Sequence, residues 1–325
     1  MPVSLTAETP AKTTPGGSDL RTRSAGYSGL LAGVAAYVIW GVFPLYFREL
    51  RGISPWEIAG FRVLTTALVT WGFLAYKRDF AWIRTALLPG VRTRVVLAGF
   101  SIAANWLIYV WAVSNGHVVD AAIGYYINPL ITVAVGVVVL KERLTLLQKV
   151  ALVLGAASVG VLSFAYGRVP WIALGLAFSF AAYGYLKKTT GLQPIQSLAA
   201  ETTALTPFAI VGLVLIARFD RLDVLHSPTK AQLFLLASGI ITAVPLVLFG
   251  MAARKIPLAQ VGLLQYIAPT MVLLCGVAVL NEHVTGERWA GVILVWAALV
   301  LLAVDAWKGM RSVNATTAQQ ISGRL

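Results

Sequence analysis

The stretch GYYINPLITVAVGVVVLKER, residues 124–143, is almost wholly apolar, yet it has tyrosine, asparagine and proline near one end and three charges at the other. A second stretch, LQYIAPTMVLLCGVAVLNEH at 264–283, has a similar layout. At an offset of 140 positions the matching residues are Pro129 with Pro269, Tyr126 with Tyr266, Ile127 with Ile267, Gly136 with Gly276, and Glu142 with Glu282. This pattern predicts two copies of one unit, although unrelated Gly- and Val-rich membrane helices would share part of it.

Composition identifies the class of protein. Hydrophobic residues fill 58% of the 325 positions and charged residues 12%, with a mean hydropathy of +0.79. A water-soluble surface cannot be built from the remainder. Apolar runs such as 95–113 reach the roughly 20 residues that an α-helix needs to cross a hydrocarbon layer about 30 Å thick. The sequence therefore predicts an all-α membrane protein.

We expect about ten transmembrane helices from a hydropathy window of about 19 residues. They are placed near 27–47, 56–76, 95–113, 121–140, 146–165, 170–186, 197–217, 231–253, 260–280 and 288–307. Residues 1–26 are polar and lack an apolar core, so they predict a disordered cytoplasmic tail and not a signal peptide. Residues 309–325 are interpreted in the same way, which leaves two five-helix units at 27–167 and 168–308.

The net charge of +13 reflects how basic residues are shared between loops. With the N-terminus inside, the cytoplasmic segments hold 18 of the 26 Lys and Arg, Lys187 and Lys188 among them, and the opposite loops hold 7. Arg62 is left within a membrane helix. This is the positive-inside pattern, which predicts both termini in the cytoplasm of an inner-membrane protein. The basicity therefore indicates topology, and no nucleic-acid partner is expected.

The repeat has a geometric consequence. Because 140 residues hold five helices, an odd number, the second unit is expected to insert upside down. The segment KER at 141–143 then faces the cytoplasm, whereas its counterpart NEH at 281–283 lacks both cations and faces outside. Inverted repeats of this kind are the construction of many secondary transporters.

Several segments also resemble a known family. They are AAYVIWGVFPLYF (35–47), NWLIYVWAVSNGHVVDAAIGYYINPL (105–130), LGLAFSFAAYG (174–184) and LLQYIAPT (263–270). In this order they are similar to the RarD branch of the EamA transporters, in the drug/metabolite transporter superfamily, over roughly 27–307. The resemblance implies a ten-helix inner-membrane permease. It does not imply a known substrate.

Two charged residues are expected inside the membrane. Arg62 would cost about 2.5–3.5 kcal/mol at the centre of a lipid-facing helix, so it must face the interior. There it could anchor an anionic or carbonyl-bearing ligand, or it could make a structural pair. Glu201 lies 139 positions later, at a near-equivalent place in the second unit. It is the candidate for proton coupling, or alternatively an interfacial carboxylate with its head in water.

Polar side chains of the third and fourth expected helices are candidates for substrate binding. Asn105 and Tyr109 are four residues apart on one face, and Tyr125 and Asn128 share a face of the next helix. Pro129 removes a backbone hydrogen bond and should free a carbonyl near Tyr125, which predicts an interruption of the helix. Hydrogen bonds between packed helices are the alternative explanation of this polarity.

The same arrangement is expected in the second unit. Gln265 and Tyr266 precede Pro269, where a second interruption is predicted. In the first expected helix, Tyr37 and Trp40 share one stripe and could wall a central cavity. The sequence thus predicts one pocket near the bilayer midplane, lined from both units.

The sequence does not support a metal site or a nucleotide-binding loop. The three histidines form no metal-ligand pattern, so no metal or other cofactor is expected. No Gly-Lys dipeptide occurs, which excludes a Walker-type nucleotide loop. Glu142 and Arg143 are interpreted as a solvated helix end, and Glu57 belongs to the first turn of the second expected helix.

These features favour a secondary transporter of small organic solutes, working by alternating access. The alternative is a membrane protein that transports nothing, such as an intramembrane enzyme or an assembly scaffold. A transporter needs a central cavity, whereas the alternative predicts that Asn105, Tyr125 and Gln265 are used in tight helix contacts. The substrate, the direction of transport, the coupling ion and the oligomeric state do not follow from the sequence.

Overall fold

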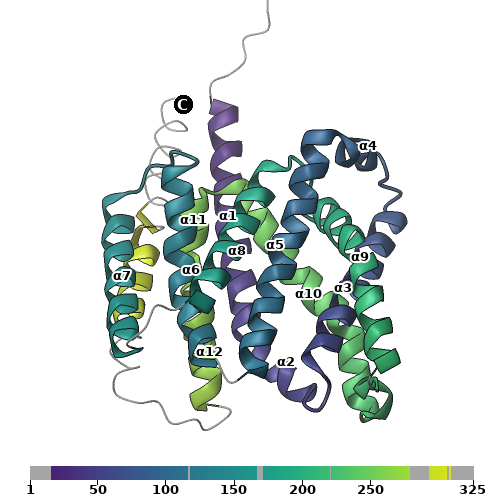
Figure 1. Ribbon diagram of the computed structural model, residues 1–325. Helices are drawn as coiled ribbons and strands as arrows, with labels where there is room; N and C mark the ends of the chain where they lie inside the picture. Colours follow the sequence, from purple (N-terminus) through teal and green to yellow (C-terminus); the bar gives the residue numbers. More distant parts are fainter. Residues whose placement is uncertain are drawn as a thin grey trace, which may run out of the picture.

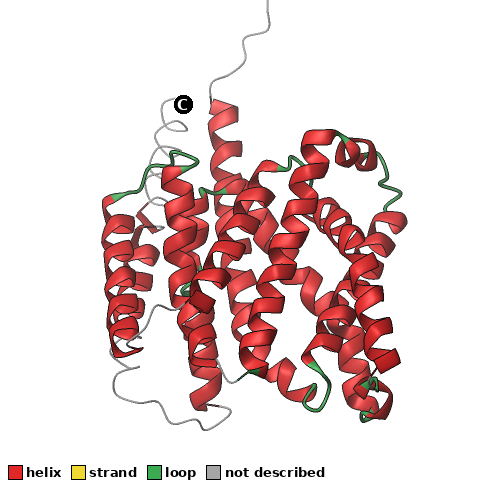
Figure 2. Ribbon diagram, viewed as in Figure 1, coloured by secondary structure: helices red, strands yellow, loops and turns green. Residues whose placement is uncertain are grey.

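The computed structural model describes residues 16–115, 118–166, 171–219, 221–278, 293–305 and 307–308, and these parts contain helices and loops without a strand. Figures 1 and 2 show a bundle of long helices joined at their ends by short loops. The elements are α1 (Gly16–Gly41), α2 (Phe43–Glu49), α3 (Pro55–Tyr76), α4 (Trp82–Leu87), α5 (Pro89–Ser114), α6 (Val118–Val138), α7 (Leu146–Tyr166), α8 (Trp171–Thr189), α9 (Pro194–Phe219), η1 (Asp223–His226), α10 (Thr229–Lys255), α11 (Leu258–Leu264) and α12 (Ile267–Ala278). A further helix covers Ile293–Asp305.

The described helices are those of a multi-pass membrane protein. Five are long and apolar enough to cross a bilayer: Gly26–Glu49, Pro55–Tyr76, Pro89–Tyr109, Pro194–Phe219 and Thr229–Lys255. Shorter apolar helices are Gly124–Val138, Leu146–Gly160, Leu258–Val272 and Ile293–Asp305. Each expected span is helical over most of its described part, but that all ten cross the membrane stays a prediction.

Three local features differ from the expected helices. Helix α1 begins at Gly16, so the end of the expected tail is helical, in a segment of Asp, Leu, Arg and Ala where no proline intervenes. The short helix α4 was not expected, because its six residues are too few for a membrane-spanning window. The first expected span divides at Val42, just before the helix α2 that carries Pro44 in its first turn.

Corresponding elements recur at the offset of the repeat. Helix α6 and the pair α11 and α12 lie 140 positions apart, with Pro129 and Pro269 at matching places. Gly52 and Gly191 precede α3 and α9 and both have positive φ, 91° and 77°. Pro55 and Pro194 are the first residues of those helices. The similarity between the two units therefore extends from sequence to backbone conformation.

Helices of the two units pack against each other throughout the bundle. Helix α1 lies against α10, α5 against α8, α3 against α9, and α6 against both α8 and α11. The contact between α3 and α10 is so close that a methyl group on Gly239 would overlap the backbone of Thr65. Beside it, the hydroxyls of Thr65 and Ser238 are 2.9 Å apart. The centre of the molecule is therefore an interface between the units.

Glu142, which was predicted to be solvated, binds a helix N-terminus instead. Its carboxylate accepts hydrogen bonds from the backbone N–H groups of Leu258 and Ala259, both at 2.8 Å. Its side chain is only 12% exposed and lies 3.5 Å from the ammonium of Lys188. The prediction was wrong because the unpaired amides at the start of α11 attract a carboxylate from a distant loop.

Glu57 makes the same kind of contact at the other end of the bundle. Its buried carboxylate accepts hydrogen bonds from the N–H groups of Asp223, at 2.8 Å, and Val224, at 3.2 Å. Both are backbone groups of η1. The first turn of α3 is thus fixed to the loop before α10.

Candidate solute-binding site

Arg62 lies on α3 among aromatic side chains. Its Nε donates a hydrogen bond to Thr242 Oγ1 on α10 at 3.0 Å. The guanidinium carbon lies 4.4 Å from the ring centroid of Trp106, and about 6 Å from those of Phe43 and Phe47. A guanidinium over an indole is a favourable cation–π arrangement. Arg62 therefore faces the interior, as its cost in lipid requires.

Three tyrosine side chains lie near the same guanidinium. Tyr46, Tyr109 and Tyr125 all lie within electrostatic range of Arg62. The rings of Tyr109 and Tyr125 meet edge to face, with their centroids 6.2 Å apart. Tyr125 is 42% exposed, but these contacts turn it toward Arg62 and α5. The structure thus brings together three predicted site residues: Arg62, Tyr109 and Tyr125.

Glu201 is buried and forms an ion pair with a residue that the sequence reading placed in a loop. Lys187 Nζ lies 2.8 Å from Glu201 Oε1, and each side chain is 1% exposed. Ser197 donates to the same oxygen, and Tyr183 donates to Oε2 at 3.3 Å. The carboxylate head is therefore not in water, and its cationic partner is Lys187 and not Arg62.

The turn between α8 and α9 explains this pair. Lys187 belongs to the last turn of α8, and Gly191, with its positive φ, reverses the chain so that α9 starts at Pro194. Glu201 then lies two turns into α9, within reach of a long lysine side chain. The sequence did contain one signal for this partner. An isolated carboxylate at the depth of Glu201 is costly, so a cation is expected nearby.

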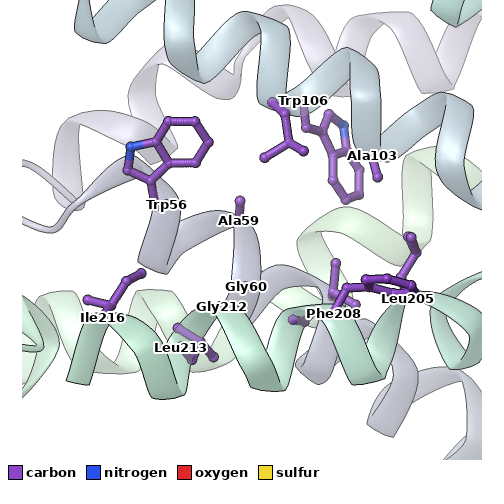
Figure 3. Close-up of a pocket in the computed structure, with 13 residues that line it drawn as sticks. Trp56, Ala59, Gly60, Ala103, Trp106, Leu205, Phe208, Gly212, Leu213 and Ile216 are labelled. Atoms are coloured by element: carbon purple, nitrogen blue, oxygen red, sulfur yellow. The ribbon is translucent and has the colours of Figure 1, made fainter. Parts of the chain in front are cut away.

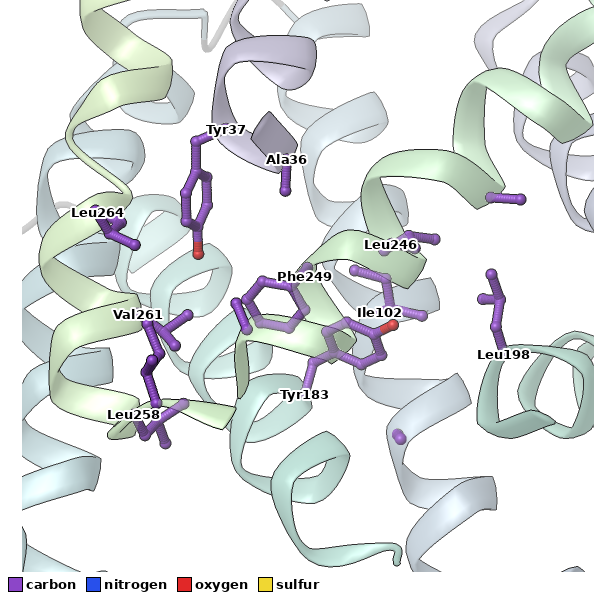
Figure 4. Packing of buried hydrophobic residues seen from close by; sticks show 14 residues of the cluster. Ala36, Tyr37, Ile102, Tyr183, Leu198, Leu246, Phe249, Leu258, Val261 and Leu264 are labelled. Atoms are coloured by element: carbon purple, nitrogen blue, oxygen red, sulfur yellow. The ribbon is translucent and has the colours of Figure 1, made fainter. Parts of the chain in front are cut away.

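An aromatic cluster packs beside the Glu201 ion pair, because Tyr183 belongs to both. Neighbouring ring centroids lie 5.4 Å apart for Tyr37 and Trp40, 5.8 Å for Trp40 and Phe180, 5.3 Å for Phe180 and Phe249, and 5.6 Å for Phe249 and Tyr183. Figure 4 shows Tyr37, Phe249 and Tyr183 converging from different helices. Tyr37 and Trp40 do share one interior stripe, but they contact packed rings.

Gln265 occupies an interruption in the second unit. Helix α11 ends at Leu264 and α12 begins at Ile267, which leaves Gln265 and Tyr266 between them, ahead of Pro269. Gln265 Nε2 donates to Thr132 Oγ1 on α6 at 2.9 Å. Its Oε1 and the Tyr37 hydroxyl interact but have no hydrogen bond of good geometry, and both atoms are buried. The described helices are thus interrupted at Gln265 and Tyr266, just ahead of Pro269.

The first unit differs at the equivalent position. Helix α6 is continuous from Val118 to Val138 and contains Pro129 in its interior. The interruption predicted at Pro129 is therefore wrong, because one missing hydrogen bond is tolerated where neighbouring helices hold the segment. Asn128 has a buried Oδ1 without a hydrogen-bond partner. The Tyr266 side chain is fully buried, and its hydroxyl lies against Gly155 of α7.

Asn105 is engaged in helix packing. Its Nδ2 donates to the carbonyl of Leu176 at 2.8 Å and to Ser179 Oγ at 3.0 Å, both on α8. These are the contacts that the packing alternative expects. A direct contact between Asn105 and substrate remains a prediction.

A cavity of about 330 Å³ lies between α3, α5 and α9. Figure 3 shows its lining, which is apolar apart from two indole groups: Trp56, Ala59, Gly60, Val63, Ala103, Trp106, Leu107, Leu205, Phe208, Ala209, Gly212, Leu213 and Ile216. Trp106 lines this cavity, and its ring also contacts the guanidinium of Arg62. Sequence reasoning missed the cavity because small and aliphatic residues are ordinary in membrane helices.

Comparisons with known proteins cover nearly the same range as the helices. The model of the EamA-like transporter family matches twice, at residues 27–164 and 169–304. The protein RarD of Streptomyces exfoliatus is 45% identical over 89% of this chain and 92% of its own length. The protein RarD of Escherichia coli is 34% identical over 86% of this chain and 94% of its own length.

Two further likenesses agree with these. An uncharacterized transporter of Pseudomonas aeruginosa is 41% identical over 87% of this chain and 95% of its own length. A solved structure, described only as the crystal structure of a protein, has a TM-score of 0.67 and 18% identity, over 85% of this chain and 98% of its own, which shows the fold alone. With two matches that together span the helical region, the chain belongs to the EamA-like transporter family.

Proposed function

We propose that this protein is a secondary transporter of small organic solutes that works by alternating access. One observation carries the proposal: polar side chains form hydrogen bonds between helices of the two units. One partner lies in the first region that matches the family model and the other in the second. Arg62 bonds to Thr242, and Gln265 bonds to Thr132. A solute bound among such contacts is held by both units, so a movement of one unit against the other changes the side from which it is reached.

We propose further that the two units are inverted five-helix repeats. The turns at Gly52 and Gly191, which both have positive φ and precede α3 and α9, support the repeat. Five spans per unit is an odd number, so the second unit begins on the opposite side of the membrane. With the positive-inside distribution of basic residues, both termini lie in the cytoplasm of an inner-membrane protein.

Glu201 is the proposed proton carrier. It is buried against Lys187, Ser197 and Tyr183, and Tyr183 belongs to the aromatic cluster. Protonation removes the charge that holds Lys187, so proton binding is linked to the contact between α8 and α9. Release of the proton restores the pair.

Solute uptake into proteoliposomes tests the proposal. The purified protein, reconstituted with and without a pH gradient, is given a panel of radiolabelled organic acids, amines, amino acids and neutral drugs, with protein-free liposomes as the control. We expect at least one class to accumulate or to exchange. A protein that is monodisperse and correctly inserted, yet moves none of them, would favour the non-transporting alternative.

A further inference from the structure

Arg62 and Glu201 occupy equivalent positions in the two units, but only one of them has a counter-charge. Glu201 is satisfied by Lys187, Ser197 and Tyr183. Arg62 precedes Glu201 by 139 positions, and Phe43 and Phe47 precede Tyr183 and Lys187 by 140, so the phenylalanines take the places of Tyr183 and Lys187 in the first unit. Both phenylalanines face the guanidinium of Arg62. The first unit therefore has the cation without the anion.

The donors of Arg62 are left partly unused. Its Nε bonds to Thr242, and no carboxylate among the described residues lies within 4 Å of its guanidinium. The Nη1 and Nη2 groups form a planar fork that fits a carboxylate with two parallel hydrogen bonds. The hydroxyls of Tyr109 and Tyr125 add further donors within electrostatic range. Arg62 is only partly buried, so these donors can take up an anion that reaches the cluster.

The cavity beside Arg62 accepts a different kind of group. It holds about 330 Å³ and has no charged residue in its lining. Trp56, Leu107 and Phe208 on its wall are 41%, 46% and 61% exposed, so it opens toward the hydrocarbon side of α3, α5 and α9. Only the indole of Trp106 is shared between this cavity and the guanidinium. An apolar group is the occupant that such a lining favours.

We propose that Arg62, Thr242, Tyr109 and Tyr125 form an anion subsite, and that the cavity behind Trp106 holds the apolar body of the same ligand. The substrate class is then organic monoanions with a hydrophobic body. This inference rests on the proposed transport function for its role, but binding is measured without transport. An absence of transport and an absence of binding are therefore separate results.

Three eight-carbon probes with closely similar hydrocarbon chains distinguish the charge requirement: octanoate, octanamide and octylamine. The full-length protein in lipid nanodiscs is titrated with each, and quenching of tryptophan fluorescence is followed, with empty nanodiscs correcting for partition into lipid. We expect saturable quenching by octanoate at concentrations at least about tenfold below those needed for octanamide, since charged hydrogen bonds are lost in the amide. Equal titrations for all three probes would overturn the anion subsite.

Variants of the subsite identify the residues responsible. Arg62→Gln should weaken octanoate binding about tenfold or more, and Arg62→Lys by less, because lysine keeps the charge but loses the fork. Phe47→Glu supplies the missing carboxylate in place of the ligand, so it should abolish octanoate binding while the nanodisc protein keeps its helical circular dichroism. Arg51→Gln makes the same charge change at an exposed position and is the matched control. Unchanged binding in folded Arg62→Gln would contradict the assignment.

The length of the ligand's hydrocarbon chain tests whether the cavity holds its apolar body. From butanoate to octanoate, affinity should rise by up to about fourfold per methylene group, the transfer free energy of one buried methylene. Ala103→Phe fills the cavity and should remove most of this dependence, while octanoate remains preferred over octanamide. An undiminished dependence in Ala103→Phe would show that the apolar body lies elsewhere.

Discussion

At the scale of single residues, the cost of burying charge decides where side chains lie. The sequence was sufficient to place Arg62 and Glu201 in the interior, because neither can face lipid. It was not sufficient to identify partners. Lys187 was interpreted as a loop residue from its position near a helix end, yet it is buried against Glu201 at 2.8 Å. Its long stem and the tight α8–α9 turn bring it inward, and neither is visible in a hydropathy window.

The Lys187–Glu201 pair should make single and double substitutions unequal. Glu201→Ala or Lys187→Ala leaves one charge buried without its partner and is expected to cost about 3–5 kcal/mol of stability. The double variant Lys187→Met with Glu201→Gln should be clearly more stable than either, in thermal unfolding followed by size-exclusion chromatography. If the two single losses simply added in the double variant, the pair would not be coupled.

Proton coupling gives Glu201 a second expected effect. Glu201→Gln keeps a side chain that can bond to Ser197 and Tyr183 but cannot exchange a proton. It should therefore lose accumulation driven by a pH gradient and keep counterflow exchange of solute, which need not release the proton. Both are measured in the same proteoliposomes. Full pH-driven accumulation in the glutamine variant would return Glu201 to a structural role.

At the scale of helices, hydropathy predicted well where helices form, but it did not predict which helix is interrupted. Every expected span is helical over most of its described part, since length and apolar content decide this. The two prolines behave differently: Pro129 lies in a continuous α6, whereas α11 and α12 are interrupted ahead of Pro269. The sequence could not distinguish these cases, because the packing of α6 against α8 and α11 holds the first helix together.

Close helix contacts predict where small residues are required. Gly239→Ala places a methyl group against the Thr65 backbone and should destabilise the protein by about 1–3 kcal/mol, as overpacking does. Gly72→Ala is the matched control, because no atom lies within 4 Å of the added carbon. Thermal unfolding in one detergent compares them. Equal melting temperatures for both variants would mean that α3 and α10 separate at no cost.

At the scale of the whole molecule, two related units are joined along a central interface. Composition was enough to predict an all-α membrane protein and the 140-residue repeat to predict two units, whereas the family was predicted from the resemblance of four segments. The way in which the units interleave, with α1 on α10 and α5 on α8, could not be predicted, because small apolar residues on many faces permit several packings. The apolar cavity between α3, α5 and α9 was missed for the same reason.

The distribution of basic residues predicts the topology of this assembly. A reporter fused after Arg311 should be active in the cytoplasm and silent outside, since the 18 inside basic residues hold both ends there. A fusion after Arg51 should give the opposite result. A periplasmic signal after Arg311 would contradict the number of spans and, with it, the inversion.

Alternating access is tested most directly by two distances measured in one protein. In a Cys275→Ser background, one pair of spin labels replaces Lys77 and Gln193, at the end where Asp79 contacts Gln196. A second pair replaces Arg51 and Leu225, at the end where Ser54 contacts Asp223. Double electron–electron resonance in nanodiscs at pH 5 and pH 8 should show one distance lengthening as the other shortens. Two distances that stay fixed, or that lengthen together, would contradict the account.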